Sequence, residues 1–134
     1  MSGLVLKLGP RERLLINGAV IENGDRRSRL NILTPNANIL RLRDAIHPGQ
    51  VNTPVRRVCY IAQLVLSGDA DPAEAQLQMM RGVDQLGQVF TDPDSSSLIE
   101  RAREAVKREN FYQALKALRS LLPHEELLLI RAET

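Results

Sequence analysis

Aromatic residues are scarce in this chain, at 3% of 134 residues, and tryptophan is absent. Residues 1–57 contain no Phe, Tyr or Trp. Proteins that bind single-stranded nucleic acid without sequence preference stack the bases on aromatic side chains. This part of the chain has no such platforms, so a nucleic-acid contact here has to use arginine, backbone groups and strand edges.

Cysteine and histidine are also rare, with one and two residues respectively. A single Cys59 excludes an internal disulfide, and its apolar helical surroundings indicate a buried structural thiol. His47 and His124 each stand beside a proline, without a metal-ligand spacing to Cys59 or to a carboxylate. The sequence has no phosphate-binding glycine loop and no hydrolase or metalloprotease motif. We therefore expect no enzyme, no catalytic residue, no metal site and no cofactor.

Long apolar runs are missing as well. No segment approaches the ~20 apolar residues of a membrane-spanning helix. The first residues lack the basic start and the apolar run of a signal peptide. We expect a cytoplasmic protein that does not contact a membrane.

Charge is divided unevenly along the chain, although the net charge is only +2. Residues 1–57 hold ten basic and four acidic side chains, a net charge of +6, which leaves −4 for residues 58–134. A basic half joined to an acidic half is typical of a module that faces a polyanion, followed by a segment with another role.

The first third of the chain has the period of short strands. Apolar or alternating runs occupy residues 4–8, 13–16, 19–22, 28–33 and 38–44, separated by turn signals. Asn17-Gly18 and Asn23-Gly24 both predict tight hairpin turns, because Asn and Gly tolerate positive φ.

The rest of the chain has helical spacing. Thr53-Pro54 and Asp71-Pro72 each supply an N-cap followed by proline at the first helical position. A third helix is expected to start in the Ser95–Ser97 cluster, and a fourth covers residues 111–122 until Pro123 interrupts it, with a short helix resuming at 125–130. The prediction is an α+β fold: a small N-terminal antiparallel β-sheet module of about five short strands (1–50), then a C-terminal α-helical region of about four helices (51–134).

Basic side chains on the predicted strands are the functional candidates. They are Lys7, Arg26, Arg27, Arg29, Arg41 and Arg43, with Arg56 and Arg57 at the start of the first helix. Arg41 and Arg43 alternate along one strand and should project from one face. The planar fork of arginine suits phosphates and base edges. Alternatively, these cations form a solvated face paired with Glu12, Glu22, Asp25 and Asp44. From the residues alone, nucleic-acid binding, a protein-binding adaptor and a purely structural role remain open.

Three ordered motifs carry a resemblance to a known family. The stretches PRERLLINGAV (Pro10–Val20), NGDRR (Asn23–Arg27) and NTPVRRVCY (Asn52–Tyr60) resemble the FlbT family, flagellin regulators of alphaproteobacteria. The resemblance covers the strand region and the first helix, and the helical tail agrees in length and character.

A fainter similarity concerns the strands alone. The segments GPRERLLINGAVI and LNILTPNANILRLRDAI are similar to the carbon storage regulator CsrA, whose strands interleave between two chains and whose edge strands grip a messenger RNA leader. This similarity implies an RNA surface on Leu6, Lys7 and Leu8, with Arg43 as a key contact. The long helical tail departs from that regulator, and the tail could cover the sheet in place of a second chain.

The FlbT resemblance implies a post-transcriptional regulator that binds the 5′ untranslated region of flagellin mRNA and promotes its degradation or represses its translation. Cellular nucleases would carry out the decay. FlaF and flagellin are the implied protein partners, and a homodimer or higher homo-oligomer is a further expectation. Charge pattern and resemblance together select these RNA contacts: Lys7, Arg26, Arg27, Arg41, Arg43, Arg56 and Arg57.

The alternative function is a flagellar chaperone or adaptor that binds flagellin or FlaF through its helical half. Apolar side chains of the tail would then dock a partner helix, unless they form the core of the domain itself. They are Leu115, Leu118, Leu121, Leu122 and Leu127–Leu129.

Overall fold

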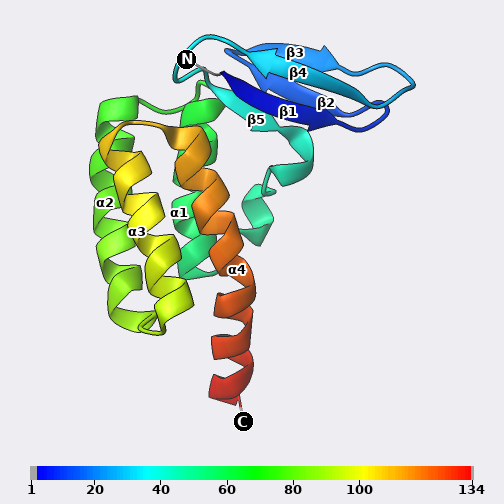
Figure 1. Cartoon of the computed structure of the whole chain (residues 1–134). Helices are drawn as coiled ribbons and strands as arrows, with labels where there is room; N and C mark the ends of the chain where they lie inside the picture. The colour runs from blue at the N-terminus through cyan, green and yellow to red at the C-terminus, as the bar shows by residue number, and fades with distance from the viewer. Residues whose placement is uncertain (1–2, 134) are drawn as a thin grey trace.

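Short antiparallel strands come first in the chain and form a layer at one end of the helices (Figure 1). The computed structural model describes residues 3–133. The strands are β1 (Leu4–Leu8), β2 (Arg13–Ile16), β3 (Ala19–Glu22), β4 (Ser28–Ile32) and β5 (Ile39–Arg41). Within residues 3–133 they make two sheets, β1–β4 and β3–β2–β5. The predicted antiparallel layer of five strands is confirmed, although it is divided between two sheets.

The two Asn-Gly steps have different structures. Asn17 and Gly18 have φ of 48° and 85° and form the two-residue turn between β2 and β3, as predicted. Asn23-Gly24 was wrongly predicted as a hairpin turn, because β4 pairs with β1 instead of returning along β3. The Asn23 amide donates hydrogen bonds to the carbonyls of Gly9 (2.7 Å) and Arg26 (2.9 Å). This residue therefore ties the β3–β4 loop to the β1–β2 turn.

The helices are α1 (Pro54–Leu66), α2 (Pro72–Val89), α3 (Pro93–Lys107) and α4 (Phe111–Glu133). The predicted caps are confirmed: the side chains of Thr53 and Asp71 accept hydrogen bonds from backbone N–H groups three residues on. The start predicted for α3 in the Ser95–Ser97 cluster is too late, because Asp92 and Pro93 repeat the same device. Each helix packs on the next and α4 packs on α1, which closes a four-helix bundle. The predicted α+β fold is thus confirmed for the described residues.

Pro123 lies inside a continuous α4, so the predicted interruption at this residue is wrong. Proline within a helix removes one backbone hydrogen bond and costs about 3 kcal/mol in an isolated helix. Packing on both sides offsets that cost here: Leu121 and Glu125 are buried, and Leu128 packs against the bundle core. The last part of α4 then projects beyond the other helices (Figure 1).

Apolar side chains gather in two clusters, one in the strand layer and one in the bundle. The strand cluster is centred on Leu6, Leu8, Leu14 and Ile39. Leu40, the next residue along β5, belongs instead to the bundle cluster, because successive strand residues point to opposite faces. Neighbouring residues of β5 therefore connect the two cores.

Cys59 is fully buried in the bundle, as the sequence predicted. Burial raises the pKa of its thiol to about 12, so the group remains protonated at neutral pH. In the part of the chain from 3 to 133, none of the helices combines the length and the apolar character needed to cross a bilayer.

A buried carboxylate joins the beginning of the bundle to its end. Glu125 of α4 is 5% exposed, and its Oε2 atom accepts a hydrogen bond of 2.9 Å from the backbone N–H of Val55 in the first turn of α1. A negative charge at a helix N-terminus is favourable because the unpaired N–H groups there carry partial positive charge. Glu125 thus caps α1 from the far end of the chain.

We expect Glu125→Ala to lower the free energy of unfolding by about 1–3 kcal/mol, because the buried Val55 N–H would lose its acceptor. Urea denaturation followed by circular dichroism measures the change. Glu126→Ala, at the neighbouring exposed position, is the matched control and should change the stability by less than about 0.5 kcal/mol. Equal effects of the two variants would contradict the capping role.

Candidate nucleic-acid interface

Two cations lie side by side on the outer surface of the β1–β4 sheet. Lys7 and Arg29 are direct partners in the antiparallel register, and both side chains are exposed, whereas Leu6 and Leu8 point into the strand core. Like charges directly opposite each other on a sheet are destabilising. Among residues 3–133, no carboxylate forms an ion pair with either cation. Folding alone does not explain this arrangement.

A shallow hollow of about 580 Å³ collects further cations at this end of the sheet. Its charged lining consists of Lys7, Arg27, Arg29 and Arg43, which we name the basic face. Leu8, Gly9, Pro10 and the exposed Ser28 complete the lining, and no acidic side chain of the described residues takes part. Hydroxyl, backbone and guanidinium groups of this kind bind phosphate oxygens.

The four carboxylates of the basic half form their shortest ion pairs outside the basic face. Glu22 pairs with Arg13 at 2.8 Å, and Asp25 pairs with Arg11 at 2.7 Å. Asp44 lies 3.3 Å from Arg119 of α4, and the remaining carboxylate, Glu12, pairs with Arg41. A solvated face neutralised by these acids therefore describes Arg11 and Arg13. Among the cations of the basic face it applies only to Arg43, whose Nε lies 3.8 Å from Glu12 and 3.9 Å from Asp44.

Glu12 and Arg41 form an ion pair that is almost removed from solvent, with side-chain exposures of 9% and 10%. The guanidinium donates from Nε to Oε2 at 2.6 Å and from Nη2 to Oε1 at 2.8 Å. These hydrogen bonds are the main reason why the pKa of Glu12 falls from 4.5 to about 2. Arg41 Nη2 also donates to the carbonyl of Lys7 at 2.6 Å. Arg41 thus braces β5 against β1.

Arg43 and Arg41 belong to different backbone elements. The expected alternation of the two along one strand is wrong, because β5 ends at Arg41 and residues 42–44 form a 3-10 turn. The Arg43 side chain is 61% exposed, and its Nε is 3.8 Å from Glu12 Oε2. Arg43 can therefore reach a ligand on the basic face, whereas Arg41 is occupied.

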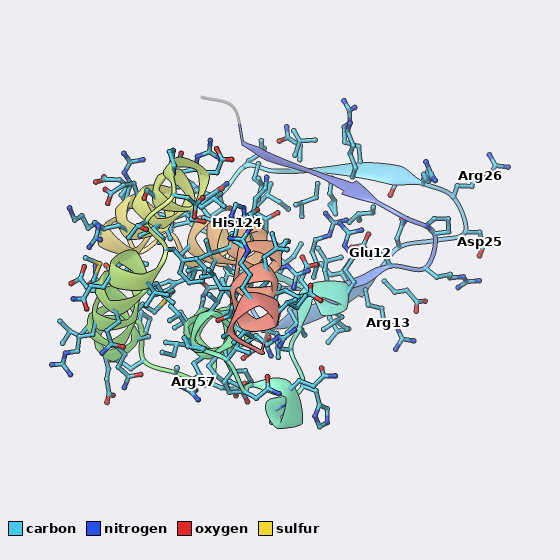
Figure 2. All side chains as sticks on the ribbon, turned by 90° about the horizontal axis from the view of Figure 1, so that it is seen from below. Glu12, Arg13, Asp25, Arg26, Arg57 and His124 are labelled. Carbon is cyan, nitrogen blue, oxygen red and sulfur yellow. The ribbon has the colours of Figure 1, made fainter. Side chains whose placement is uncertain are left out.

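The other predicted contacts occupy separate places. Arg26 lies at the outer tip of the strand layer, next to Asp25, and Arg57 lies on the helical side of the molecule (Figure 2). Arg56 lies in the first turn of α1 and donates to Asn52 at 3.3 Å. The structure therefore brings together Lys7, Arg27 and Arg43, and adds Arg29, which the predicted contacts omitted. Its position opposite Lys7 depends on the pairing of β1 with β4, which no local sequence signal specifies.

A serine, a histidine and an aspartate meet where α3 begins, beside α4. Ser95 Oγ lies 2.8 Å from His124 Nδ1, and Asp92 Oδ2 lies 3.9 Å from the same nitrogen. A catalytic triad instead places the histidine between the two partners, with one ring nitrogen for each. Ser95 is also fully buried. This cluster fastens the α3 N-terminus to α4, and a substrate could not reach the hydroxyl.

Comparisons with known proteins concern most of the chain. The sequence model of the family described as "Flagellar protein FlbT" matches residues 4–129. The "Probable flagellum biosynthesis repressor protein FlbT 1" of Bradyrhizobium diazoefficiens is 34% identical over 93% of this chain and 84% of its own length. The "Flagellum biosynthesis repressor protein FlbT" of Caulobacter vibrioides is 30% identical over 92% of this chain and 86% of its own length. No solved structure gives a significant match.

The Glu12–Arg41 pair predicts a specific dependence of stability on pH. The pKa of Glu12 is lowered from 4.5 to about 2 in the folded chain. The ionised carboxylate therefore contributes its full stabilisation above about pH 4.5, and this stabilisation is lost as the pH falls towards about 2. We expect Glu12→Gln to lower the free energy of unfolding at pH 7 by roughly 2–3 kcal/mol, since Arg41 would be left buried without its counter-charge. Denaturant titrations between pH 7 and about pH 2 should show the two proteins converging in acid. A constant difference would refute the assignment.

Proposed function

The chain belongs to the FlbT family, and from this premise we propose that it represses flagellum biosynthesis by binding the 5′ untranslated region of flagellin mRNA. The repressor role comes from the names of its relatives. The observation that carries the RNA contact is the basic face. There Lys7, Arg27 and Arg29 have no carboxylate partner among residues 3–133, and Arg43 has only long contacts, 3.8 Å to Glu12 and 3.9 Å to Asp44.

The chemistry of this face suits a sugar–phosphate backbone. Arginine binds phosphate oxygens in a bidentate manner, and lysine adds a mobile positive charge. Residues 1–57 contain no aromatic side chain, so base stacking contributes nothing there, and sequence preference has to arise from base edges and the exposed backbone. Val5, on the same outer face of β1 and 48% exposed, offers an apolar contact next to Lys7.

Repression follows from occupancy of the leader. A protein bound there competes with the ribosome for the messenger, and an untranslated messenger is open to cellular nucleases. Competition with the ribosome and exposure of the messenger to nucleases both require only that the chain binds the leader. The proposal therefore assigns no hydrolytic step to the chain itself. Arg41 supports this function indirectly, because its bond to the Lys7 carbonyl fixes the strand that presents Lys7.

The test replaces three cations of the basic face together, Lys7→Ala, Arg29→Ala and Arg43→Ala. We expect the affinity for the flagellin leader to fall roughly tenfold or more, and the slope of log K against log salt to decrease in magnitude by about 2, which corresponds to three lost phosphate contacts on a single strand. Fluorescence anisotropy with labelled leader RNA at several salt concentrations measures both quantities.

The matched control is Arg81→Ala with Arg101→Ala, which removes exposed arginines from α2 and α3 and should leave leader binding unchanged. Loss of affinity in this control as large as in the triple variant would show that only net charge matters. Unchanged affinity in the triple variant would contradict the proposed surface.

A second candidate function is the flagellar chaperone or adaptor that binds flagellin or FlaF. Five of the seven leucines considered for it are occupied within the bundle. Leu115, Leu118 and Leu121 are buried, and Leu122 and Leu128 pack against the bundle core. The projecting end of α4 favours it, however, because three large apolar side chains remain about half exposed there: Leu127 (56%), Leu129 (46%) and Ile130 (52%).

The two functions separate in the variant Leu127→Ser with Ile130→Ser. If the adaptor function operates, this variant loses binding to purified flagellin or FlaF in isothermal titration calorimetry while keeping its affinity for the leader. The triple variant of the basic face should show the opposite pattern. If this α4 variant binds flagellin and FlaF as tightly as the wild-type protein does, the end of α4 is not the binding surface for either protein.

A further inference from the structure

The four-helix bundle has four outer grooves, one between each pair of adjacent helices, and the chain itself closes or neutralises three of them. Over the α1–α4 groove lies the linker after β5: Gln63 exchanges hydrogen bonds with the backbone of Ile46 at 2.6 and 3.1 Å, and Arg119 donates to the Asp44 carbonyl at 3.1 Å. Side chains also bridge the α2–α3 groove, where Arg103 pairs with Asp84.

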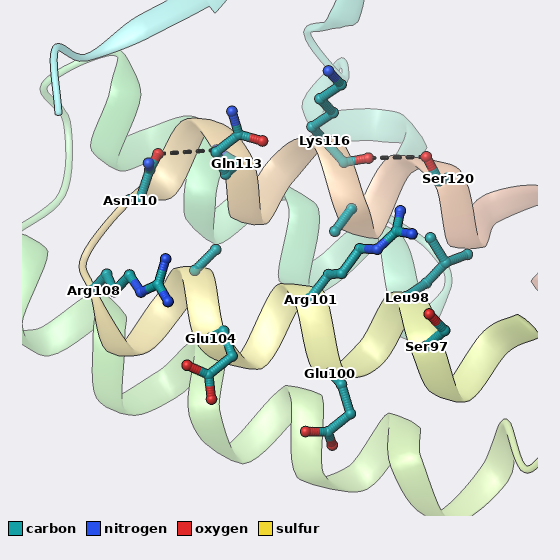
Figure 3. Close-up of a pocket in the computed structure, with 12 residues that line it drawn as sticks. Ser97, Leu98, Glu100, Arg101, Glu104, Arg108, Asn110, Gln113, Lys116 and Ser120 are labelled. Atoms are coloured by element: carbon teal, nitrogen blue, oxygen red, sulfur yellow. Dashed lines mark hydrogen bonds between the residues drawn. The ribbon is translucent and has the colours of Figure 1, made fainter. Parts of the chain in front are cut away.

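The α3–α4 groove is open but carries both signs of charge. Figure 3 shows Glu100, Glu104, Arg101 and Arg108 along α3, with Gln113 and Lys116 on α4 opposite. Mixed charge of this kind is typical of a solvated surface, because each ion has an opposite charge and water nearby.

The α1–α2 groove differs from the other three. It is a hollow of about 420 Å³ with an apolar floor made by Val58, Ile61, Leu86 and Val89. Val89 is 62% exposed. The absence of a side chain at Gly82 lets α1 and α2 approach closely, since a Cβ atom there would lie 2.6 Å from Val58 Cγ2. Within the described residues, no segment of the chain covers this floor.

The rim of this groove has one sign of charge. The charged lining consists of Arg57 of α1 and Arg81 of α2. Gln78 and Gln85 also line the hollow, and no carboxylate of the described residues does. Both arginines are exposed, and neither has an ion pair among residues 3–133. An apolar floor between unpaired arginines is complementary to apolar side chains flanked by carboxylates.

We propose that the α1–α2 groove binds an acidic amphipathic helix of a protein partner. The lining of α2 extends from Gln78 to Val89, which at 1.5 Å per residue is about 17 Å, or three turns of a docked helix. Aliphatic side chains of that helix contact Ile61 and Val89, and its glutamates or aspartates contact Arg57 and Arg81. This surface is separate from the basic face, so the chain can hold RNA and a protein at once.

The test places a photoactivatable crosslinking residue at Gln85, an exposed position in the groove, in the full chain expressed in flagellated cells. We expect the crosslinked peptides, sequenced by mass spectrometry, to come from a helix of another protein with carboxylates beside apolar residues. Gln78→Glu with Arg81→Glu should reduce this crosslink at least tenfold, and lysines in place of the partner's carboxylates should restore it.

In the control, the photoactivatable residue replaces Glu104 in the α3–α4 groove. This position should not give the crosslink. Crosslinks from Gln85 to RNA, to a second copy of this chain or to a basic segment would overturn the proposal. A crosslinking yield at Gln85 no higher than at Glu104 would also overturn the proposal, as would a crosslink that persists in the Gln78→Glu, Arg81→Glu double variant. Leader binding by the double variant, measured by anisotropy, should be unchanged, so failure here and failure of RNA binding are distinguishable.

Discussion

The ion pair between Glu12 and Arg41 is the contact on which the strand layer and its surface charge depend. One guanidinium joins the β1–β2 turn, through Glu12, to the carbonyl of Lys7 in β1 and to its own strand β5. A charge pair this far from solvent is strongly destabilising when one partner is removed, so neither residue is free to serve a ligand. Because Arg41 takes the short hydrogen bonds of Glu12, Arg43 keeps only a contact of 3.8 Å to that carboxylate and remains 61% exposed.

Local signals predicted the fold well wherever one residue and its neighbours determine the geometry. The structure confirms the helix starts predicted at Thr53-Pro54 and Asp71-Pro72 and the turn predicted at Asn17-Gly18. Each of these features depends on contacts within a few residues. The errors at Asn23 and Pro123 have the opposite cause, because contacts distant in sequence decide them. Asn23 bonds to the β1–β2 turn, and α4 continues through Pro123 because the bundle packs on both sides of it.

The candidate site shows the same division. Composition located the charge in residues 1–57, but only strand pairing could reveal that Lys7 lies opposite Arg29 and that the Arg41 side chain is only 10% exposed. Arg57 illustrates the limit most clearly. In sequence it continues the basic half, whereas in space it borders an apolar groove on the far side of the molecule (Figure 2). Net charge along a chain therefore does not define one surface.

The cap that Glu125 provides for α1 has a consequence for the order of synthesis. The N–H of Val55 leaves the ribosome long before its acceptor, which is 70 residues further along the chain. Until then Thr53 alone caps the start of α1, and a chain that stops near Pro123 leaves the buried N–H of Val55 without its acceptor. The contact between α1 and α4 is therefore complete only after Glu125 has been synthesised, and chains truncated before it are distinguishable from longer ones by proteases that attack frayed helix ends.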